Sequence, residues 1–340
     1  MKKMIKTFTA VGLMLVINTS MVFASVPFND TAMTSYNDAI EALASQEIVG
    51  GVGHGLFQPD RQITNAEAIQ MITKAFNINL SYMTFIKAPE LSDFFDFASA
   101  DAWYEDAFIN AGANGLPIDR TIMPNESMTR ENFYSILEAA MEMRNELPMI
   151  NLIPTAIEDF ESMDVLKSGA IHRALAYGIL KLDEDGMFYP NAYLTRGEAA
   201  QAVYDAMNVE HKLEAAGNAM TGKLEVTEAE DGVTLTFTMK NDSDETALLT
   251  YHNGQRYDIY IYDSYGTLIY QWSNDKVFTM AIESVVVDPG KTIEYETVWP
   301  MTDNEGKRVL RGQYNVVFES AYDIVGNKAT TTDSMFIIVP

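Results

Sequence analysis

The sequence predicts two kinds of domain in one chain: an all-α N-terminal half built from three repeats, and an all-β, immunoglobulin-like antiparallel sandwich at the C-terminal end. Two observations lead to this prediction. A proline followed five residues later by a threonine recurs three times at one period, and after Asn208 the apolar period changes from helical to two. With 340 residues, 47% of them hydrophobic, the chain has enough material for more than one packed core.

Residues 1–24 have the pattern of a secretory signal peptide. Three lysines precede the apolar stretch 11–17. The segment ends in Val22-Phe23-Ala24, with small residues at the positions that a signal peptidase reads, and we expect cleavage after Ala24. The alternative is a membrane-spanning anchor, which needs roughly 20 apolar residues. Because this stretch is shorter, we favour cleavage, and because no later segment is long and apolar enough to span a bilayer, we expect the mature chain to be exported and to have no membrane contact.

Composition excludes several function classes. The chain has 23 Lys and Arg against 48 Asp and Glu, a formal net charge of −25. Because nucleic-acid binding draws its affinity from clustered cationic side chains, this balance argues against a nucleic-acid partner. The chain has no cysteine, which excludes disulfides, thiolate metal sites and cysteine nucleophiles.

In each of the three repeats, a similar loop segment separates two helical patterns. The proline-to-threonine segments are Phe57-Gln-Pro-Asp-Arg-Gln-Ile-Thr64, Ile122-Met-Pro-Asn-Glu-Ser-Met-Thr129 and Phe188-Tyr-Pro-Asn-Ala-Tyr-Leu-Thr195, and their threonines are 65 and 66 residues apart. Before each segment a helical apolar pattern closes in a glycine-containing bend, and after it a second helix begins. We place the repeats at 25–80, 81–145 and 146–209.

Two of the threonines begin capping boxes. In Thr64-Asn-Ala-Glu67 and Thr195-Arg-Gly-Glu198 the hydroxyl can accept a bond from a backbone N–H of the first turn, and the glutamate can reach back to the threonine amide. A capping box alone indicates only a helix start. Its recurrence at one period, after a proline and a large apolar residue, indicates a repeated module.

From Phe28 to Asn208 the order of these motifs resembles the S-layer homology (SLH) family, in three copies. The resemblance implies a pseudo-threefold, mostly helical trimer of repeats that binds a secondary cell-wall polysaccharide, typically one bearing pyruvylated N-acetylmannosamine. It also implies that the arginine after the motif threonine lies in a groove between repeats and, with a nearby acidic residue, holds the acidic sugar. A guanidinium can bind a pyruvate carboxylate through two parallel hydrogen bonds.

The third repeat keeps the family's residues best, and its groove is the first candidate for the polymer site. It has Thr195, Arg196 and Glu198, whereas the second repeat has Thr129 and Arg130 but no glutamate at the matching place.

The first repeat has Thr64 and Glu67 but Asn65 in place of the arginine, so we expect its groove to be weak or purely structural. Arg61 either compensates for this loss or is simply solvated. Trp103 matches an aromatic residue at the start of a module, and both packing against a helix and stacking on a sugar remain open for it.

The C-terminal part has the pattern of an antiparallel sandwich. A charged connector is expected over 210–222, followed by the sandwich over 223–340. Val233, Leu235, Phe237 and Met239 alternate with polar residues, as a half-buried strand requires. Turn signals separate some seven to nine short strands in all.

This part resembles the BsuPI-type proteinase inhibitors. The residues that carry the resemblance include Asp263-Ser-Tyr-Gly-Thr-Leu-Ile-Tyr-Gln-Trp272, Val287-Asp-Pro-Gly-Lys291 and Gly312-Gln-Tyr314. The family's activity is inhibition of an intracellular serine proteinase, which an exported chain does not meet. The resemblance therefore implies a fold and a protein-binding surface, with no reactive loop evident in the sequence.

No pattern of catalytic or metal-binding residues is present. The four histidines are scattered, and the acidic turns 183–186 and 241–245 lack the glutamate that a calcium loop needs. We expect no enzyme activity, cofactor or metal. The sequence predicts non-covalent anchoring of a displayed sandwich to the Gram-positive cell wall. An inhibitor of an exported serine proteinase and a structural S-layer subunit remain as alternatives.

Overall fold

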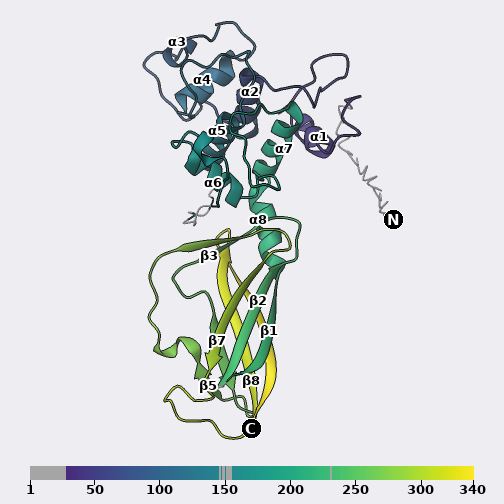
Figure 1. The fold of residues 1–340 in the computed structure, drawn as a ribbon. Helices are drawn as coiled ribbons and strands as arrows, with labels where there is room; N and C mark the ends of the chain where they lie inside the picture. The colour runs from purple at the N-terminus through teal and green to yellow at the C-terminus, as the bar shows by residue number, and fades with distance from the viewer. Residues whose placement is uncertain (1–27, 145–146, 148–149, 151–154, 230–231) are drawn as a thin grey trace, which may run out of the picture.

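Helices form the N-terminal part of the molecule and strands the C-terminal part, as Figure 1 shows. The computed structural model describes residues 28–144, 147, 150, 155–229 and 232–340. The expected signal peptide, 1–24, lies outside these residues. Within them, no helix has both the length and the apolar content that crossing a bilayer demands.

Each repeat contributes two main helices. The first helices of the repeats are α1 (Asn37–Ser45), α4 (Glu105–Ala113) and α6 (Ser168–Ala176), and the second helices are α2 (Asn65–Ala75), α5 (Arg130–Glu142) and α7 (Arg196–Met207). Short helices α3 (Leu91–Phe94) and η1 (Phe160–Ser162) precede α4 and α6. The sequence-based prediction of helix, loop and helix in each repeat is confirmed.

The helices pack across repeat boundaries. The second helices α2, α5 and α7 contact one another, while α1 packs on α7, α4 on α2 and α6 on α5. Each first helix therefore lies on the second helix of the preceding repeat, and the first repeat follows the third. The apolar faces of all six helices contribute to one core that extends through the three repeats.

Backbone hydrogen bonds close the same circle at the starts of the second helices. The first N–H groups of a helix have no partner inside it, and here they donate to loop carbonyls of another repeat, at 2.8–3.1 Å. Asn65 and Ala66 donate to Glu126 and Pro124, Arg130 and Glu131 to Ala192 and Pro190, and Arg196 and Gly197 to Arg61 and Pro59. Isolated bridges Gln62–Thr195, Thr64–Ser127 and Thr129–Tyr193 join the same segments.

The expected connector, 210–222, is regular structure. Val209–Asn218 form helix α8, and strand β1 (Met220–Ala229) begins two residues later. Val209 and Leu213 lie at helical spacing and are buried in the N-terminal core, while Ala216 is buried in the C-terminal core. The charged residues that suggested a connector include Glu210 and His211, which are exposed. Helix α8 thus belongs to both cores.

The C-terminal domain consists of two antiparallel sheets. One has the order β1-β2-β7 and the other β5-β4-β8-β3-β6, with β9 paired to β8. The strands after β1 are β2 (Gly232–Asn241), β3 (Ala247–Tyr251), β4 (Asp258–Tyr262), β5 (Leu268–Gln271), β6 (Glu283–Val287), β7 (Thr292–Trp299), β8 (Gly312–Ile324) and β9 (Asn327–Val339). Short helix η2 (Trp272–Asp275) follows β5.

The predicted inward face of β2 lies between the two sheets. Leu235, Phe237 and Met239 are fully buried. The ring of Phe237 stacks on that of Phe318 in β8, with ring centroids 4.2 Å apart. This packing of two sheets is consistent with the predicted sandwich.

The contact of the third repeat with the first leaves no room for a side chain at Gly197. A Cβ there would lie 2.3 Å from the Tyr36 ring. We expect Gly197→Ala to lower the free energy of unfolding by about 1–3 kcal/mol, because overpacking forces the ring to move. Urea denaturation followed by far-UV circular dichroism measures this change.

The matched control for this substitution is Gly169→Ala, at the same position of helix α6. A Cβ at Gly169 would lie 3.4 Å from the Arg173 guanidinium, an ordinary contact, so this variant should be as stable as the wild type or slightly more stable. Equal stability of the two variants would contradict the packing described for Gly197.

Candidate functional site

All three motif threonines cap second helices. Thr64 and Thr195 each accept a hydrogen bond from the backbone N–H of the glutamate three residues later, and Glu67 and Glu198 accept one in return from the threonine N–H. Both predicted capping boxes are therefore confirmed. Thr129 accepts a bond from the Asn132 N–H alone, because an asparagine stands where the other repeats have glutamate.

The residue after each threonine enters a groove formed with the bend of another repeat. We name these pockets the Arg196 groove, the Arg130 groove and the Asn65 groove. The Arg196 groove is lined by 48–52, Glu67 and Trp103 of the first two repeats, and the Asn65 groove by 116–119 of the second. The Arg130 groove is lined by Gly178, Ile179, Lys181 and Glu198 of the third repeat. The cyclic packing of the repeats places one such groove at each junction.

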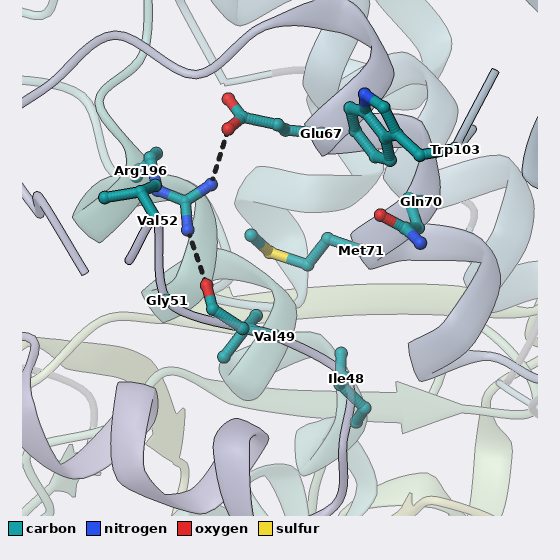
Figure 2. A pocket seen from close by; sticks show the side chains of 10 residues that line it. Ile48, Val49, Gly51, Val52, Glu67, Gln70, Met71, Trp103 and Arg196 are labelled. Carbon is teal, nitrogen blue, oxygen red and sulfur yellow. Dashed lines mark hydrogen bonds and ion pairs between the residues drawn. The ribbon is translucent and has the colours of Figure 1, made fainter. Parts of the chain in front are cut away.

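Protein groups occupy much of the Arg196 guanidinium. Arg196 is only 5% exposed. Its Nε and Nη2 donate to the carbonyl oxygens of Phe57 and Gly50, both at 3.0 Å, and its Nη1 lies 3.0 Å from Glu67 Oε1. The guanidinium also covers the Phe57 ring at 4.4 Å. Figure 2 shows the bonds to Glu67 and to the bend. Two of the five guanidinium N–H groups remain without a partner among the described residues.

Glu67 couples this groove to the helix start. Its Oε2 accepts the Thr64 N–H at 3.0 Å, and its Oε1 accepts from Arg61 at 2.5 Å. Burial opposes ionisation of Glu67, but the hydrogen bonds from Arg61 and Thr64 and the charge of Arg196 outweigh it, so its pKa lies below the ordinary value of 4.5. Arg61, whose side chain is 36% exposed, thus pairs with Glu67 of the Arg196 groove and does not compensate for Asn65.

The Arg130 guanidinium is less committed than that of Arg196. Arg130 is half-buried and donates from Nε to the Phe188 carbonyl at 2.9 Å. Its Cζ lies 5.5 Å from the Phe188 ring centroid and 5.8 Å from that of Tyr134. Among the described residues it has no ion-pair partner and no hydrogen bond from its Nη atoms. Four guanidinium N–H groups are thus available in a groove of about 620 Å³.

The groove around Arg130 also contains the phenol of Tyr134 and the carboxylate of Glu198. Burial raises the pKa of Tyr134 to about 12, so its hydroxyl is neutral at physiological pH. Glu198 lines the same groove, and its Oε2 accepts the Thr195 N–H at 2.8 Å. An arginine and a glutamate therefore face one groove without forming an ion pair with each other within the described structure.

The Asn65 groove is unsuited to an anion. Asn65 is 6% exposed and donates from Nδ2 to the Met123 carbonyl at 2.8 Å. Lys167 is the one cation among the described lining residues, beside Asp119, Glu126 and Asp164, and it pairs with Asp164 and with Glu131. That this groove is weak or purely structural stays a prediction.

The aromatic pair at the start of the second repeat divides into two roles. Tyr104 is 5% exposed, and its ring lies 5.0 Å from that of Phe108 in the core. Trp103 is 58% exposed and lines the Arg196 groove, where Figure 2 shows its ring across the pocket from Arg196. Tyr104 is thus packed in the core, while Trp103 remains exposed in the groove.

Several groove residues were not identified from the sequence. Gln70 and Met71 line the Arg196 groove, and Lys181 and Tyr134 line the Arg130 groove. Helical spacing was a signal for Gln70, three residues after Glu67, and for Tyr134, four residues after Arg130. The bend residues had no such signal, because their groove is completed by a different repeat.

Family models match both parts of the chain. One described as "S-layer homology domain" matches residues 27–69 and 164–200, and one described as "Intracellular proteinase inhibitor" (BsuPI) matches residues 220–322. The chain thus carries SLH domains in its N-terminal half and a C-terminal BsuPI domain. The two SLH matches fall in the first and third repeats.

Curated relatives match more than half of the chain. Exoglucanase XynX of Acetivibrio thermocellus is 30% identical over 191 residues, which are 56% of this chain and 17% of that protein. The Surface-layer 125 kDa protein of Lysinibacillus sphaericus is 27% identical over 221 residues, 62% of this chain and 17% of that protein. The chain therefore spans less than a fifth of the length of either relative.

Among solved structures, the sporulation control protein Spo0M of Bacillus subtilis aligns with 35% of this chain and 49% of its own, at 14% identity and a TM-score of 0.22. This likeness is too low to carry an argument about function.

The network around Glu67 predicts an acid-sensitive stability. Because its folded pKa lies below its unfolded value of 4.5, ionised Glu67 stabilises the fold above that pH, and this contribution is lost as pH falls through the folded pKa. We expect Glu67→Gln to lower the free energy of unfolding by about 1–3 kcal/mol at pH 7. The difference from the wild type should shrink progressively below pH 4.5, as measured by urea denaturation across pH.

The control for this prediction is Glu225→Gln, at an ion pair whose partners are 73% and 57% exposed. It should leave stability unchanged at both ends of the pH range. A pH-independent loss in Glu67→Gln would show that the carboxylate charge is not what matters.

Proposed function

We propose that this protein anchors itself without covalent bonds to a Gram-positive cell wall, by binding a pyruvylated secondary wall polysaccharide in grooves of its SLH half, and displays the BsuPI domain at the cell surface. The single observation that carries the proposal is that the Arg130 guanidinium has no ion-pair partner among the described residues of its groove. Its equivalent in the third repeat, Arg196, is held by protein groups in a different groove. The matched SLH domains and a relative named as a surface-layer protein support the location.

The chemistry of the groove suits an acidic sugar. A carboxylate accepts two parallel hydrogen bonds from a guanidinium, and such charge-assisted bonds are stronger than neutral ones. The neutral Tyr134 hydroxyl and the carboxylate of Glu198 are hydrogen-bonding groups for sugar hydroxyls. A protein of net charge −25 repels anions at long range, so an acidic ligand depends on such local donors.

The pseudo-threefold trimer is part of this proposal. Helix pairing, backbone bonds and the placement of the grooves repeat in the same cyclic order, which supports three equivalent positions with different residues. We assign polymer binding first to the Arg130 groove and second to the Arg196 groove, where two N–H groups and the exposed face of Trp103 are available. The Asn65 groove has a structural role.

Export completes the proposal. The signal pattern over 1–24 supplies the route, and cleavage after Ala24 leaves the SLH half free to meet the wall. In this proposal the wall polymer holds the exported molecule at the cell surface.

Loss of Arg130 should release the protein from the wall. We expect Arg130→Ala to weaken binding to purified wall sacculi by about tenfold to hundredfold, the equivalent of losing a charge-assisted hydrogen bond. Cosedimentation of the full mature chain with sacculi measures this effect. Chemical removal of pyruvyl groups should reduce wild-type binding to the level of the variant.

Two further variants separate binding from folding. Asn65→Ala should bind as the wild type does, because it removes no charge. Arg196→Ala should weaken binding and also lower the unfolding temperature, since Arg196 bonds to the bend and Glu67. Equal retention of all three variants, or wild-type binding that survives depyruvylation, would refute the anchoring proposal.

A second candidate function belongs to the BsuPI domain and rests on its loop 276–282. Val277 and Met280 are 99% and 88% exposed, while Phe278 packs toward Trp272 with ring centroids 5.9 Å apart. The Thr279 carbonyl accepts the Gly254 N–H at 2.9 Å. Exposed apolar side chains on an anchored, irregular segment are the form in which a loop enters a proteinase cleft. This supports inhibition of an exported serine proteinase.

The loop predicts a specific loss of inhibition. If the full chain inhibits a secreted serine proteinase, Met280→Asp should abolish inhibition, because an apolar subsite rejects a carboxylate. Residual hydrolysis of a peptide substrate measures it, with Tyr265→Asp as the control at another exposed turn. Unchanged inhibition in Met280→Asp would exclude this loop.

A further inference from the structure

The bends of the three repeats differ at one matched position. Each bend closes with the same backbone bond, at 3.0 Å, from Ile48 to Leu43, from Leu116 to Ala111 and from Ile179 to Ala174. This fixes the alignment of the bends and places three residues in register, two positions after the donor: Gly50, Ile118 and Lys181. Each lines its own groove. Only the Arg130 groove has a cation there.

Lys181 is available to a ligand. Its side chain is exposed, and it forms no ion pair with any described residue. The other lysine of the groove, Lys212, is neutralised by Asp205 at 2.9 Å and Glu245 at 2.6 Å. Lys181 and Arg130 are thus the two unpaired cations of one groove in a strongly acidic chain.

The C-terminal domain holds the bend that carries Lys181. Gly178 has φ +69°, and a Cβ on it would lie 3.1 Å from the Thr246 side chain, which precedes β3. Leu248 of β3 is buried in the helical core, and the Lys212–Glu245 pair joins α8 to the loop before β3. Asp244 and Glu245 also line the Arg130 groove. Neither of the other two grooves has a described lining residue from the C-terminal domain.

We propose that Lys181 is a second ligand-binding cation of the Arg130 groove, which with Arg130 holds one acidic unit of the wall glycan and makes this groove the strongest of the three. This inference rests on the proposed function. A lysine ammonium is a compact charge on a flexible stem, so it reaches a carboxylate or a hydroxyl that the fixed guanidinium does not. The second repeat, whose motif lacks the glutamate, thereby gains a ligand contact from Lys181 that its own motif does not provide.

A double-mutant cycle with the full mature chain tests the proposal. The probe is purified pyruvylated wall polysaccharide, and calorimetry measures its affinity for the wild type, Lys181→Ala, Arg130→Ala and the double variant. We expect Lys181→Ala to lower affinity about threefold to tenfold, less than Arg130→Ala because the ammonium is exposed. In the Arg130→Ala background the same substitution should have a much smaller effect, and Lys181→Arg should retain binding.

Lys307→Ala is the control, since it removes an equal charge from an exposed loop of the C-terminal domain outside the groove. An equal loss in Lys307→Ala, or a full loss from Lys181→Ala in the absence of Arg130, would show a general charge effect and overturn the proposal. Absence of wild-type binding would instead overturn the anchoring function and this inference with it. Because Lys181 is exposed, an unchanged unfolding temperature verifies that Lys181→Ala still folds.

Discussion

The helical half depends on one constraint: the first backbone N–H groups of each second helix must find acceptors outside that helix. In an isolated repeat, water would satisfy these donors. Here the carbonyls of another repeat's proline loop do so, in the order first to second, second to third and third to first. Such an order closes only when three repeats are present. The same contact places the residue after the threonine against the neighbouring repeat. The contacts that close the ring of repeats therefore also form the grooves.

At the position after the motif threonine, hydrogen bonds that stabilise the fold use donors that a ligand would otherwise bind. Arg196 has a carboxylate and two carbonyls within reach, so its charge is largely used to fix the first bend. Arg130 has one carbonyl and two aromatic rings, which position the guanidinium but leave most of its donors free. Asn65 keeps a single hydrogen bond and no charge. The same position therefore ranges from mostly structural to mostly open, according to the partners that the next repeat supplies.

Local features of the fold were readable from the sequence, and the cyclic ones were not. Capping boxes at Thr64 and Thr195 depend on residues three apart, and the inward face of β2 depends on a period of two, so both followed from short patterns. The bend that completes each groove lies about 50 or more residues from the residue after the threonine, and no local pattern specifies which repeat supplies it. The sequence therefore favoured Arg196, because its motif is complete. The glutamate of that motif, Glu198, caps its own helix, however, and the guanidinium of Arg196 pairs with Glu67 of another repeat. Helix α8 was missed because charged residues interrupt its apolar ones, and only the spacing of Val209, Leu213 and Ala216 marked the buried face.

Helix α8 gives the molecule a mechanical property. Its residues are buried in both cores, and β1 begins two residues after its end. No flexible linker therefore separates the C-terminal domain from the helical half. A force on that domain is therefore transmitted through helix α8 and the Lys212 ion pairs to the residues that line the Arg130 groove.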